Sequence, residues 1–255
     1  MGTATHNTAT GIIKIHYGKY PSIWRRHMKK FTTNLPTLAA TFAALALAAI
    51  TVPAAAQSAG QWTVKVGENL ITPKVSSGDL SGPGLGGVKV DVNSAYAPIV
   101  AATYMVTDNV STELVLGLPY RHDMIGKGSI DGVGKIGDVQ QLPPTLFVQY
   151  RFMEPQAKLR PYVGLGLTYA YFRDAHASPT LVALLGPTNI EIDAKFGITP
   201  QIGATYSIND RWFLDTALTK TYLKTTATLD SSGTKRTIDT KLDPVAFSIS
   251  VGYKF

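Results

Sequence analysis

The chain has 255 residues, of which 45% are hydrophobic and 16% charged, and it contains no cysteine. The net charge of +7 comes almost wholly from residues 1–56, which hold six basic residues and no acidic one, whereas the remainder holds 18 basic and 17 acidic residues. The body of the chain is therefore nearly neutral, which argues against a nucleic-acid binder. No stretch after residue 56 has 18 consecutive apolar residues, so no membrane-spanning helix is predicted there.

The beginning of the chain has the pattern of an export signal. A basic pair, Lys29-Lys30, precedes an apolar run over residues 38–52, and Pro53 with three alanines leads to Gln57. The run of about 15 residues is shorter than the roughly 20 that a membrane anchor needs. We therefore expect a cleaved signal peptide at residues 28–56 rather than an anchor.

Residues 1–27 resemble neither a signal nor a domain. We interpret them as an unassigned leader upstream of a true start at Met28, with a start at Met1 as the alternative.

From residue 57 onward, short segments alternate between apolar and polar or small residues, which is typical of strands with one apolar face. The clearest segment is the last, residues 245–255, where every second residue is apolar up to Phe255. In chain order we expect eight strands, the first beginning near residue 61 and the others at about 88–106, 112–119, 140–153, 160–172, 190–198, 212–222 and 245–255. A change of parity after Gly67 predicts a bulge, and Pro200 predicts another.

The predicted connections alternate in length. Tight turns at 107–109, 154–159 and 208–211 alternate with longer loops at 76–87, 123–137, 174–189 and 229–236; residues 181–185 could form a short helical turn or a plug-like segment. Short turns on one side, longer loops on the other and an even strand number predict an all-β fold, an eight-stranded antiparallel transmembrane β-barrel over residues 57–255. A terminal strand of a soluble β-sandwich is the alternative for the apolar end of the chain.

Two further features fit a barrel in the bacterial outer membrane. Aromatic residues lie at the expected strand ends, where interfacial girdles form: Tyr104, Tyr150, Phe152, Trp212, Tyr253 and Phe255. The second strand, at about 19 residues, is much longer than the roughly 9–11 residues that cross a bilayer. We therefore expect the barrel to extend beyond the membrane on one side.

The parity of the strands predicts an interior of mixed polarity. The inward positions include the apolar residues Ile99, Met105, Val115, Phe147 and Phe172 and the charged residues Lys89, Asp91, Glu113, Arg151 and Lys195. Such a lumen is either a solid plug or a narrow apolar passage or pocket for a small hydrophobic molecule. Parity alone does not separate these two interpretations.

Five motifs in the body of the chain resemble the OmpW family of outer-membrane proteins. They are Tyr104-Met-Val-Thr-Asp-Asn-Val110, Pro119-Tyr-Arg-His122, Leu142-Pro-Pro-Thr-Leu146, Arg160-Pro-Tyr-Val-Gly-Leu-Gly166, and Leu242-Asp-Pro244 followed by Val251-Gly-Tyr-Lys-Phe255. The resemblance implies an eight-stranded barrel with a hydrophobic channel that carries small hydrophobic compounds and releases them sideways into the membrane. It also implies that a residue on the third strand and one on the sixth narrow the channel.

The positions that match this constriction are Val115 and Phe196. Parity places Val115 inside the barrel and Phe196 outside, unless a bulge at Pro200 resets the register.

The implied partners are outer-membrane lipid, small hydrophobic solutes and the outer-membrane assembly machinery, which would act on the C-terminal strand ending in Phe255. We expect no cofactor and no metal site, because neither His122 nor His176 has a second ligand at metal-binding spacing. Two other functions stay open: a structural or adhesive barrel with a plugged lumen, and a lipid-modifying enzyme that uses His122 with Ser129 and either Asp123 or Asp131.

Overall fold

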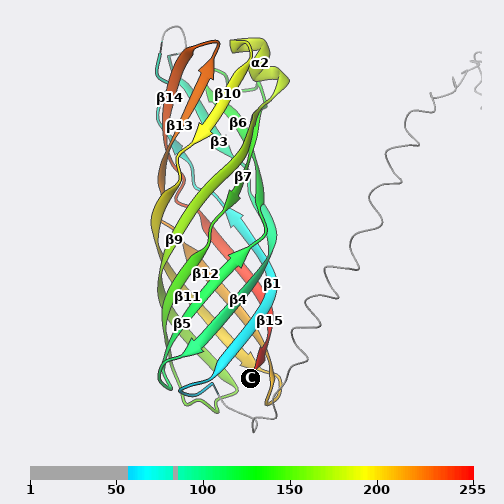
Figure 1. Ribbon diagram of the computed structural model, residues 1–255, viewed down its shortest axis with the longest axis vertical. Coiled ribbons are helices and arrows are strands. Elements are labelled where there is room, and N and C mark those ends of the chain that lie inside the picture. Colours follow the sequence, from blue (N-terminus) through cyan, green and yellow to red (C-terminus); the bar gives the residue numbers. More distant parts are fainter. Residues whose placement is uncertain (1–56, 83–85) are drawn as a thin grey trace, which may run out of the picture. The chain divides into compact units, whose positions relative to one another are not determined.

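A computed structural model describes residues 57–82 and 86–255, which form a closed antiparallel β-barrel with one short helix (Figure 1). The expected leader and signal peptide, residues 1–56, lie outside these described residues. Within the described ranges, no helix combines the length and the apolar character needed to cross a membrane.

The barrel has two tiers, which we call the membrane tier and the outer tier. The membrane tier pairs, in order, β1 (Trp62–Thr72), β4 (Ala95–Met105), β5 (Val110–Gly117), β8 (Thr145–Arg151), β9 (Leu159–Ala177), β11 (Lys195–Ser207), β12 (Trp212–Lys220) and β15 (Val245–Lys254). Strand β15 also pairs with β1, over Thr63↔Lys254 to Thr72↔Val245, and this pairing closes the cylinder. A closed barrel leaves no strand edge unpaired, as lipid requires.

The outer tier continues the same eight-stranded wall. Its strands are β2 (Ser76–Ser77), β3 (Val88–Val92), β6 (Tyr120–Gly128), β7 (Lys135–Leu142), the end of β9, β10 (Thr188–Ile192), β13 (Lys224–Ser231) and β14 (Thr234–Lys241). This tier closes between β2 and β3, where the Leu80 amide donates to the Val88 carbonyl at 2.9 Å and the Val90 amide donates to Ser77 Oγ at 3.1 Å. The expected second strand of about 19 residues is two strands, β3 and β4, and the extension of the barrel past the membrane stays a prediction.

In the part of the chain that the structure describes, seven of the eight strand positions around the barrel break where the tiers meet, and β9 alone is continuous through both tiers. Prolines, which cannot donate to a β-ladder, mark several of the breaks: Pro73, Pro119, Pro143, Pro144 and Pro244. The break also changes parity, because Val88 in the outer tier and Ile99 in the membrane tier both point inward. The inward placement of Lys89 and Asp91 was therefore wrong, because these side chains lie exposed on the outside of the barrel. The inward placement of Lys195 was also wrong, because its side chain, at the first position of β11, is exposed and pairs with Asp193 at 3.1 Å.

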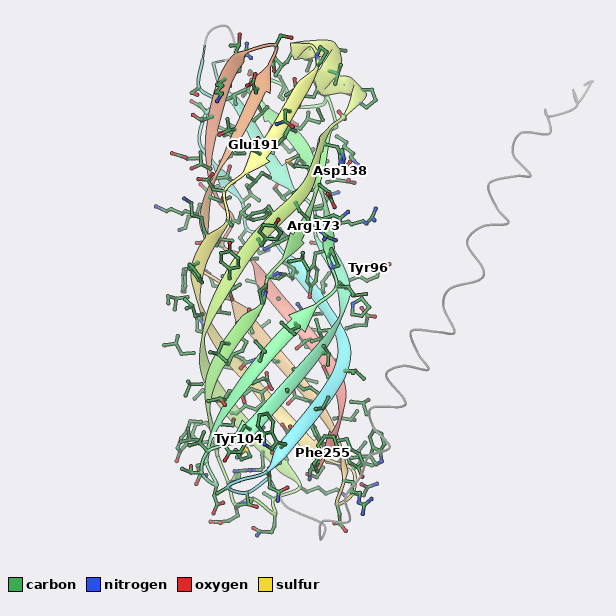
Figure 2. The ribbon with its side chains drawn as sticks, in the orientation of Figure 1. Tyr96, Tyr104, Asp138, Arg173, Glu191 and Phe255 are labelled. Carbon is green, nitrogen blue, oxygen red and sulfur yellow. The ribbon has the colours of Figure 1, made fainter. Side chains whose placement is uncertain are left out.

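The outside of the membrane tier is apolar. Leucine, valine and isoleucine side chains stand exposed at alternate positions, including Val66, Leu114, Leu116, Leu146, Val148, Leu165, Leu167, Ile202, Leu214, Leu218 and Ile249. The predicted aromatic girdle is confirmed at the tight-turn end, where Trp62 packs on Tyr104 at 4.9 Å and Tyr253 on Phe255 at 5.2 Å between ring centroids (Figure 2). This surface suits lipid and not water.

The outside of the outer tier is charged instead. Asp138, Arg173 and Glu191 lie on it, well away from the girdle residues Tyr104 and Phe255 (Figure 2). Lys135 makes exposed ion pairs with Asp123 at 2.6 Å and with Asp138 at 3.0 Å. Water therefore replaces lipid as the solvent of this tier.

Three of the predicted long loops are largely regular structure. Within 123–137, only residues 129–134 lie between strands. Within 229–236, the strands β13 and β14 are joined by the turn Ser232-Gly233, and both of these residues have positive φ. Within 174–189 the helix α2 (Pro179–Leu185) is capped by Ser178, so the expected helical turn is confirmed. Strands that face water lack the outward apolar residues by which we recognised strands, which explains the error.

Neither predicted bulge is present. Strand β1 keeps one register through Gly67 with both of its neighbours. Strand β11 likewise keeps its register with β9 through Pro200, which pairs with Leu165. The apparent change of parity in β1 arises because Glu68 stands on the outward face among apolar residues.

Candidate binding site in the barrel lumen

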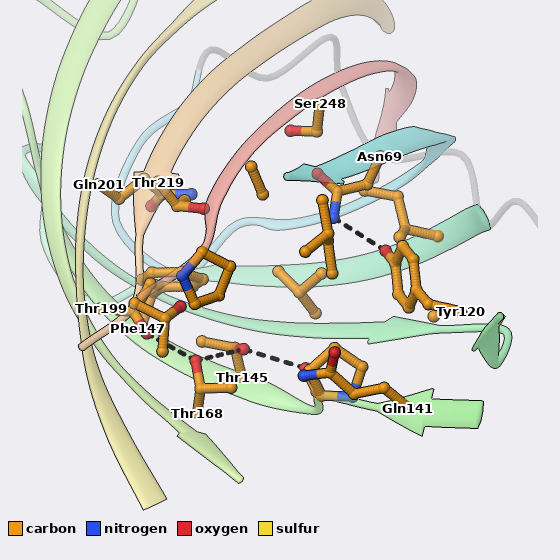
Figure 3. Close-up of a pocket in the computed structure, with 18 of the residues that line it drawn as sticks. Asn69, Tyr120, Gln141, Thr145, Phe147, Thr168, Thr199, Gln201, Thr219 and Ser248 are labelled. Carbon is orange, nitrogen blue, oxygen red and sulfur yellow. Dashed lines mark hydrogen bonds between the residues drawn. The ribbon is translucent and has the colours of Figure 1, made fainter. Parts of the chain in front are cut away.

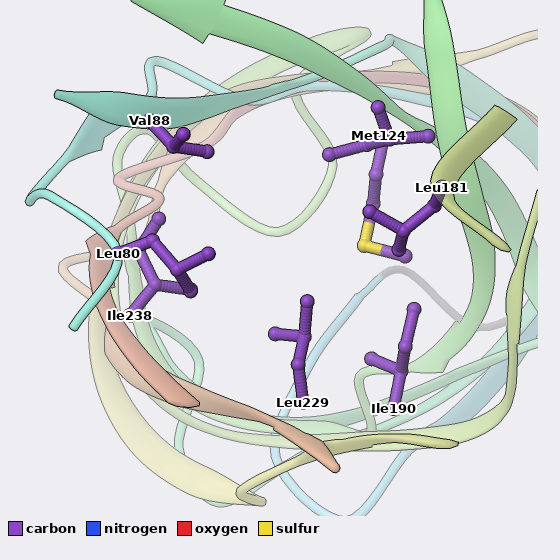
Figure 4. Close-up of a cluster of buried hydrophobic side chains, with 8 residues drawn as sticks. Leu80, Val88, Met124, Leu181, Ile190, Leu229 and Ile238 are labelled. Atoms are coloured by element: carbon purple, nitrogen blue, oxygen red, sulfur yellow. The ribbon is translucent and has the colours of Figure 1, made fainter. Parts of the chain in front are cut away.

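Three adjacent cavities occupy the barrel interior, and the outermost is almost wholly apolar. Figure 4 shows side chains from several strands and from α2 pointing into it: Leu80, Val88, Met124, Leu181, Ile190, Leu229 and Ile238. Leu184 of α2 lines the same cavity and is 52% exposed, so the cavity reaches solvent at this end.

The middle cavity lies where the two tiers meet. It shares the lining residues Val90, Met124 and Ala227 with the outer cavity, so the two apolar cavities are adjacent. Its wall also carries Phe172, Ile192 and Leu242, with His122, Gln141, Thr225 and Thr240 as the polar side chains.

The inner cavity lies in the membrane tier and has a mixed lining (Figure 3). It shares Gln141 and Pro244 with the middle cavity. One side is apolar, with Ile71, Ile99 and Val115, and the other carries threonines joined by hydrogen bonds, such as Thr145 to Thr168 at 2.8 Å. Polarity therefore rises along the lumen from the outer end inward.

Below the inner cavity, a network of buried charges, which we call the polar plug, fills the barrel. Lys65 Nζ lies 2.9 Å from Glu113 Oε2 and 2.6 Å from Asp215 Oδ1, and all three residues are buried. Asp215 also accepts hydrogen bonds from Tyr162 and Thr205, at 3.1 and 2.8 Å.

Arg151 extends the plug toward the tight turns. Its guanidinium donates to Gln149 Oε1 at 2.8 Å and to Thr205 Oγ1 at 3.0 Å. Arg151 makes these hydrogen bonds to neutral groups, whereas Lys65 is the cation that pairs with both carboxylates, so the buried charges of the plug are held by ion pairs and hydrogen bonds, as burial requires. Apolar molecules would find no favourable path through this region.

His122 of β6 is the one titratable side chain in the wall of the middle cavity, within the described residues. It is 2% exposed, and its Nδ1 lies 2.7 Å from the Asn93 carbonyl oxygen. Burial lowers the pKa of the imidazole below its ordinary value, which keeps the ring neutral at pH 7.

The structure brings five of the six residues predicted for the lumen into the barrel interior. Ile99, Met105 and Phe147 are buried, Val115 lines the inner cavity, and Phe172 lines the middle cavity. Of these, Met105 lies outside the three cavities. Their role in narrowing a passage stays a prediction.

The placement of Phe196 in the lumen was wrong. Its side chain is 66% exposed and packs on Tyr169 at 4.9 Å on the outside of the barrel. Gly197 occupies the inward position, and no bulge at Pro200 shifts the register. A constriction in this chain must therefore come from other residues.

The residues considered for catalysis are not assembled. Asp123 pairs with Lys135 at 2.6 Å and Asp131 with Lys127 at 3.0 Å, both on the surface. Among the described residues, no hydrogen bond joins His122 to Ser129 or to either carboxylate. The geometry of a nucleophile, base and orienting acid is not present there.

Parity reasoning missed Lys65, Asp215 and the outer cavity. Lys65 falls on the inward parity of the first strand, but the assumed bulge beside it obscured that parity. About half of the lining of the outer cavity comes from segments predicted as loops, such as Met124, Ile136 and Leu229. A search for charged residues on inward parities, carried through all eight strands, could have found the plug.

Together these features define an outer-membrane β-barrel of eight strands, whose lumen holds apolar cavities above a polar plug. A family model described as the OmpW family matches residues 58–255. The chain belongs to the OmpW family.

Individual relatives agree with this assignment. Outer membrane protein W of Vibrio cholerae is 32% identical over 229 residues, covering 89% of this chain and 100% of that protein. Outer membrane protein W of Escherichia coli is 32% identical over 220 residues, covering 84% and 98% of the two chains. The crystal structure of OprG from Pseudomonas aeruginosa is similar with a TM-score of 0.72 at 30% identity, covering 78% of this chain and 97% of that one. The bacterial outer membrane is therefore the location of this protein.

Proposed function

We propose that the barrel takes up small hydrophobic molecules at its outer end and delivers them sideways into the membrane. The observation that carries this proposal is the gradient of the lumen: two adjacent apolar cavities, both lined by Val90, Met124 and Ala227, lie above a plug of buried charged side chains. Apolar solutes gain free energy by leaving water for such cavities. The plug stops them before the tight-turn end.

A weak point in the wall supports sideways release. Pairing between β3 and β6 ends at Val92↔Met124, and pairing between β4 and β5 begins only at Ile99↔Gly117. Across the gap, backbone hydrogen bonds join Asn93 to Asp123 and Leu118 to Pro98. The adjoining wall of the lumen consists of small side chains.

These small residues are Ala95 and Ala97, and they are covered from inside by Tyr120, whose hydroxyl accepts a hydrogen bond from Asn69 at 2.8 Å. Tyr120 also lines the inner cavity (Figure 3). Movement of this one ring would open the cavity toward lipid between β4 and β6.

The test is a charge placed in the passage. Val115→Arg should lower uptake of a hydrophobic fluorescent tracer into cells by at least about tenfold, because a charge in an apolar passage is costly to desolvate. Folding is checked by the mobility shift of the unheated protein on gels. Val115→Ala should transport normally, and Asn189→Arg, which puts the same charge on the exposed wall, should do likewise.

Normal uptake by a folded Val115→Arg variant would contradict the passage. The alternative of a structural or adhesive barrel makes the opposite prediction: removal of residues 129–134 and 179–185 would abolish function, while Val115→Arg would have little effect. Assembly through the C-terminal strand ending in Phe255 remains part of the proposal, supported by the pairing of β15 with both β1 and β12.

A further inference from the structure

His122 is a buried polar group in an apolar cavity, and among the described residues no group completes a hydrogen bond to its Nε2. The side chain of Gln141 is close enough to the ring to raise its pKa, but it does not complete a hydrogen bond to Nε2 in this structure. The ring is held in place by the Asn93 carbonyl at Nδ1 and lies near Tyr120, at 6.4 Å between ring centroids with an interplanar angle of 19°. A buried nitrogen without a partner is unfavourable by itself, so its presence needs an explanation.

The partner at Nδ1 determines what Nε2 can do. A carbonyl oxygen only accepts hydrogen bonds, so Nδ1 must carry the ring proton. In a neutral imidazole the other nitrogen is then an acceptor with a free lone pair. Nε2 therefore selects for a group that donates a hydrogen bond.

The surroundings of the ring indicate what would carry that donor. The wall of the middle cavity around it is formed mainly by Val92, Met124, Val139, Phe172 and Leu242. Such a wall suits a hydrocarbon body and leaves one end of the molecule to be matched by the imidazole.

We propose that Nε2 of His122 accepts a hydrogen bond from the hydroxyl group of a small, otherwise apolar molecule held in the middle cavity. The class includes phenols, alcohols and protonated carboxylic acids. The inference rests on the proposed function, because it names the kind of solute for the same lumen. It adds that the lumen distinguishes hydroxylated molecules from plain hydrocarbons.

The first experiment compares two isosteres, phenol and toluene, in which a hydroxyl replaces a methyl group. Their binding to protein purified from outer membranes is measured by titration calorimetry, with protein-free micelles as the blank. The ratio of the toluene to the phenol dissociation constant should fall by roughly three- to tenfold in His122→Phe, since one hydrogen bond is lost. Toluene should bind this variant as well as it binds the unaltered protein.

Two more variants keep the test decisive. His122→Gln, whose side-chain oxygen can accept a hydrogen bond, should restore part of the preference. Gln141 lies in the same cavity wall and raises the pKa of the imidazole. Gln141→Leu is therefore the matched control, and it should keep the preference for phenol over toluene.

A second readout follows the nitrogen itself. In protein with ¹⁵N-labelled histidine, phenol but not toluene should shift the Nε2 resonance of His122. His176, whose side chain is 69% exposed, should not respond.

The outcomes separate the two proposals. If toluene binds and the ratio of the toluene to the phenol dissociation constant is the same with and without His122, the assignment of His122 is wrong. The proposal of an apolar lumen would then still hold. A preference that is lost in Gln141→Leu but kept in His122→Phe also overturns the assignment. If neither compound binds, the proposed function fails, and the role of His122 fails with it.

Discussion

Lys65 is the residue on which the closed end of the lumen depends. Its ammonium is the one cation within 4 Å of the carboxylates of Glu113 and Asp215, among the described residues. Those carboxylates come from β5 and β12, on different sides of β1, so the lysine joins strands that do not pair with one another. Such a residue is needed for the plug to be both closed and stable.

We expect Lys65→Met to destabilise the barrel by about 3–5 kcal/mol, because it leaves two buried carboxylates without a cation. The measurement is urea-induced unfolding in detergent micelles, followed by tryptophan fluorescence. Lys89→Met is the control, since Lys89 pairs with Asp79 only at 3.8 Å on the exposed surface and should change stability by less than about 1 kcal/mol. Equal effects of the two substitutions would contradict the role of Lys65.

At the scale of the strands, the two tiers differ in what holds them. In the membrane tier, β1 pairs over ten positions with β15 and over ten with β4. In the outer tier, β2 pairs with β14 over only two positions, and its contact with β3 depends on the hydrogen bonds at Val88 and Ser77. Local stability should follow this difference, because segments with few hydrogen bonds open first.

We therefore expect amide hydrogen exchange to be fastest at the β2–β3 seam, intermediate in the β13–β14 hairpin, and slowest in β1, β4 and β15. Exchange measured by mass spectrometry on the protein in lipid vesicles checks this order. Uniform protection of both tiers would contradict the expectation that the outer tier is locally less stable than the membrane tier. Protection at the seam that rises in the presence of an apolar ligand would place that ligand in the outer part of the lumen.

For the whole molecule, the position in the membrane follows from the two solvents, lipid and water, that contact the outside of the barrel. The apolar wall of the membrane tier includes Leu165 of β9, which is 58% exposed, whereas the outer tier presents charges. A lipid-facing charge near the bilayer centre is costly, and one on a water-facing wall is not.

Leu165→Arg should lower the free energy of unfolding in lipid vesicles by about 2–4 kcal/mol. The same substitution at the exposed Thr234 of β14 should change it by less than about 0.5 kcal/mol. Both values come from urea titrations of protein inserted in the same vesicles. If arginine were tolerated equally at the two positions, the membrane boundary drawn here would be wrong.

Much of the membrane tier could be predicted from the sequence, because each of its strands shows its own alternation of apolar with polar or small residues. Alternation from Val245 to Phe255 requires an apolar solvent on one side, and the same pattern in the other segments indicates eight strands. Val115 and Phe147 could be assigned to the interior for this reason. Placing a residue in the lumen because it matches a family position was less reliable, as the outward side chain of Phe196 shows.

What only the tertiary structure decided concerns relations between strands. The outer tier alternates apolar inside and charged outside, the reverse of the membrane tier, and some breaks also change parity, as between Val88 of β3 and Ile99 of β4. Glu113, Lys65 and Asp215 meet across three strands that are far apart in the chain, and His122 faces a cavity built by several others. Periodicity reports the faces of one strand, whereas a lumen, its plug and its cavities exist only once the register of all eight is set.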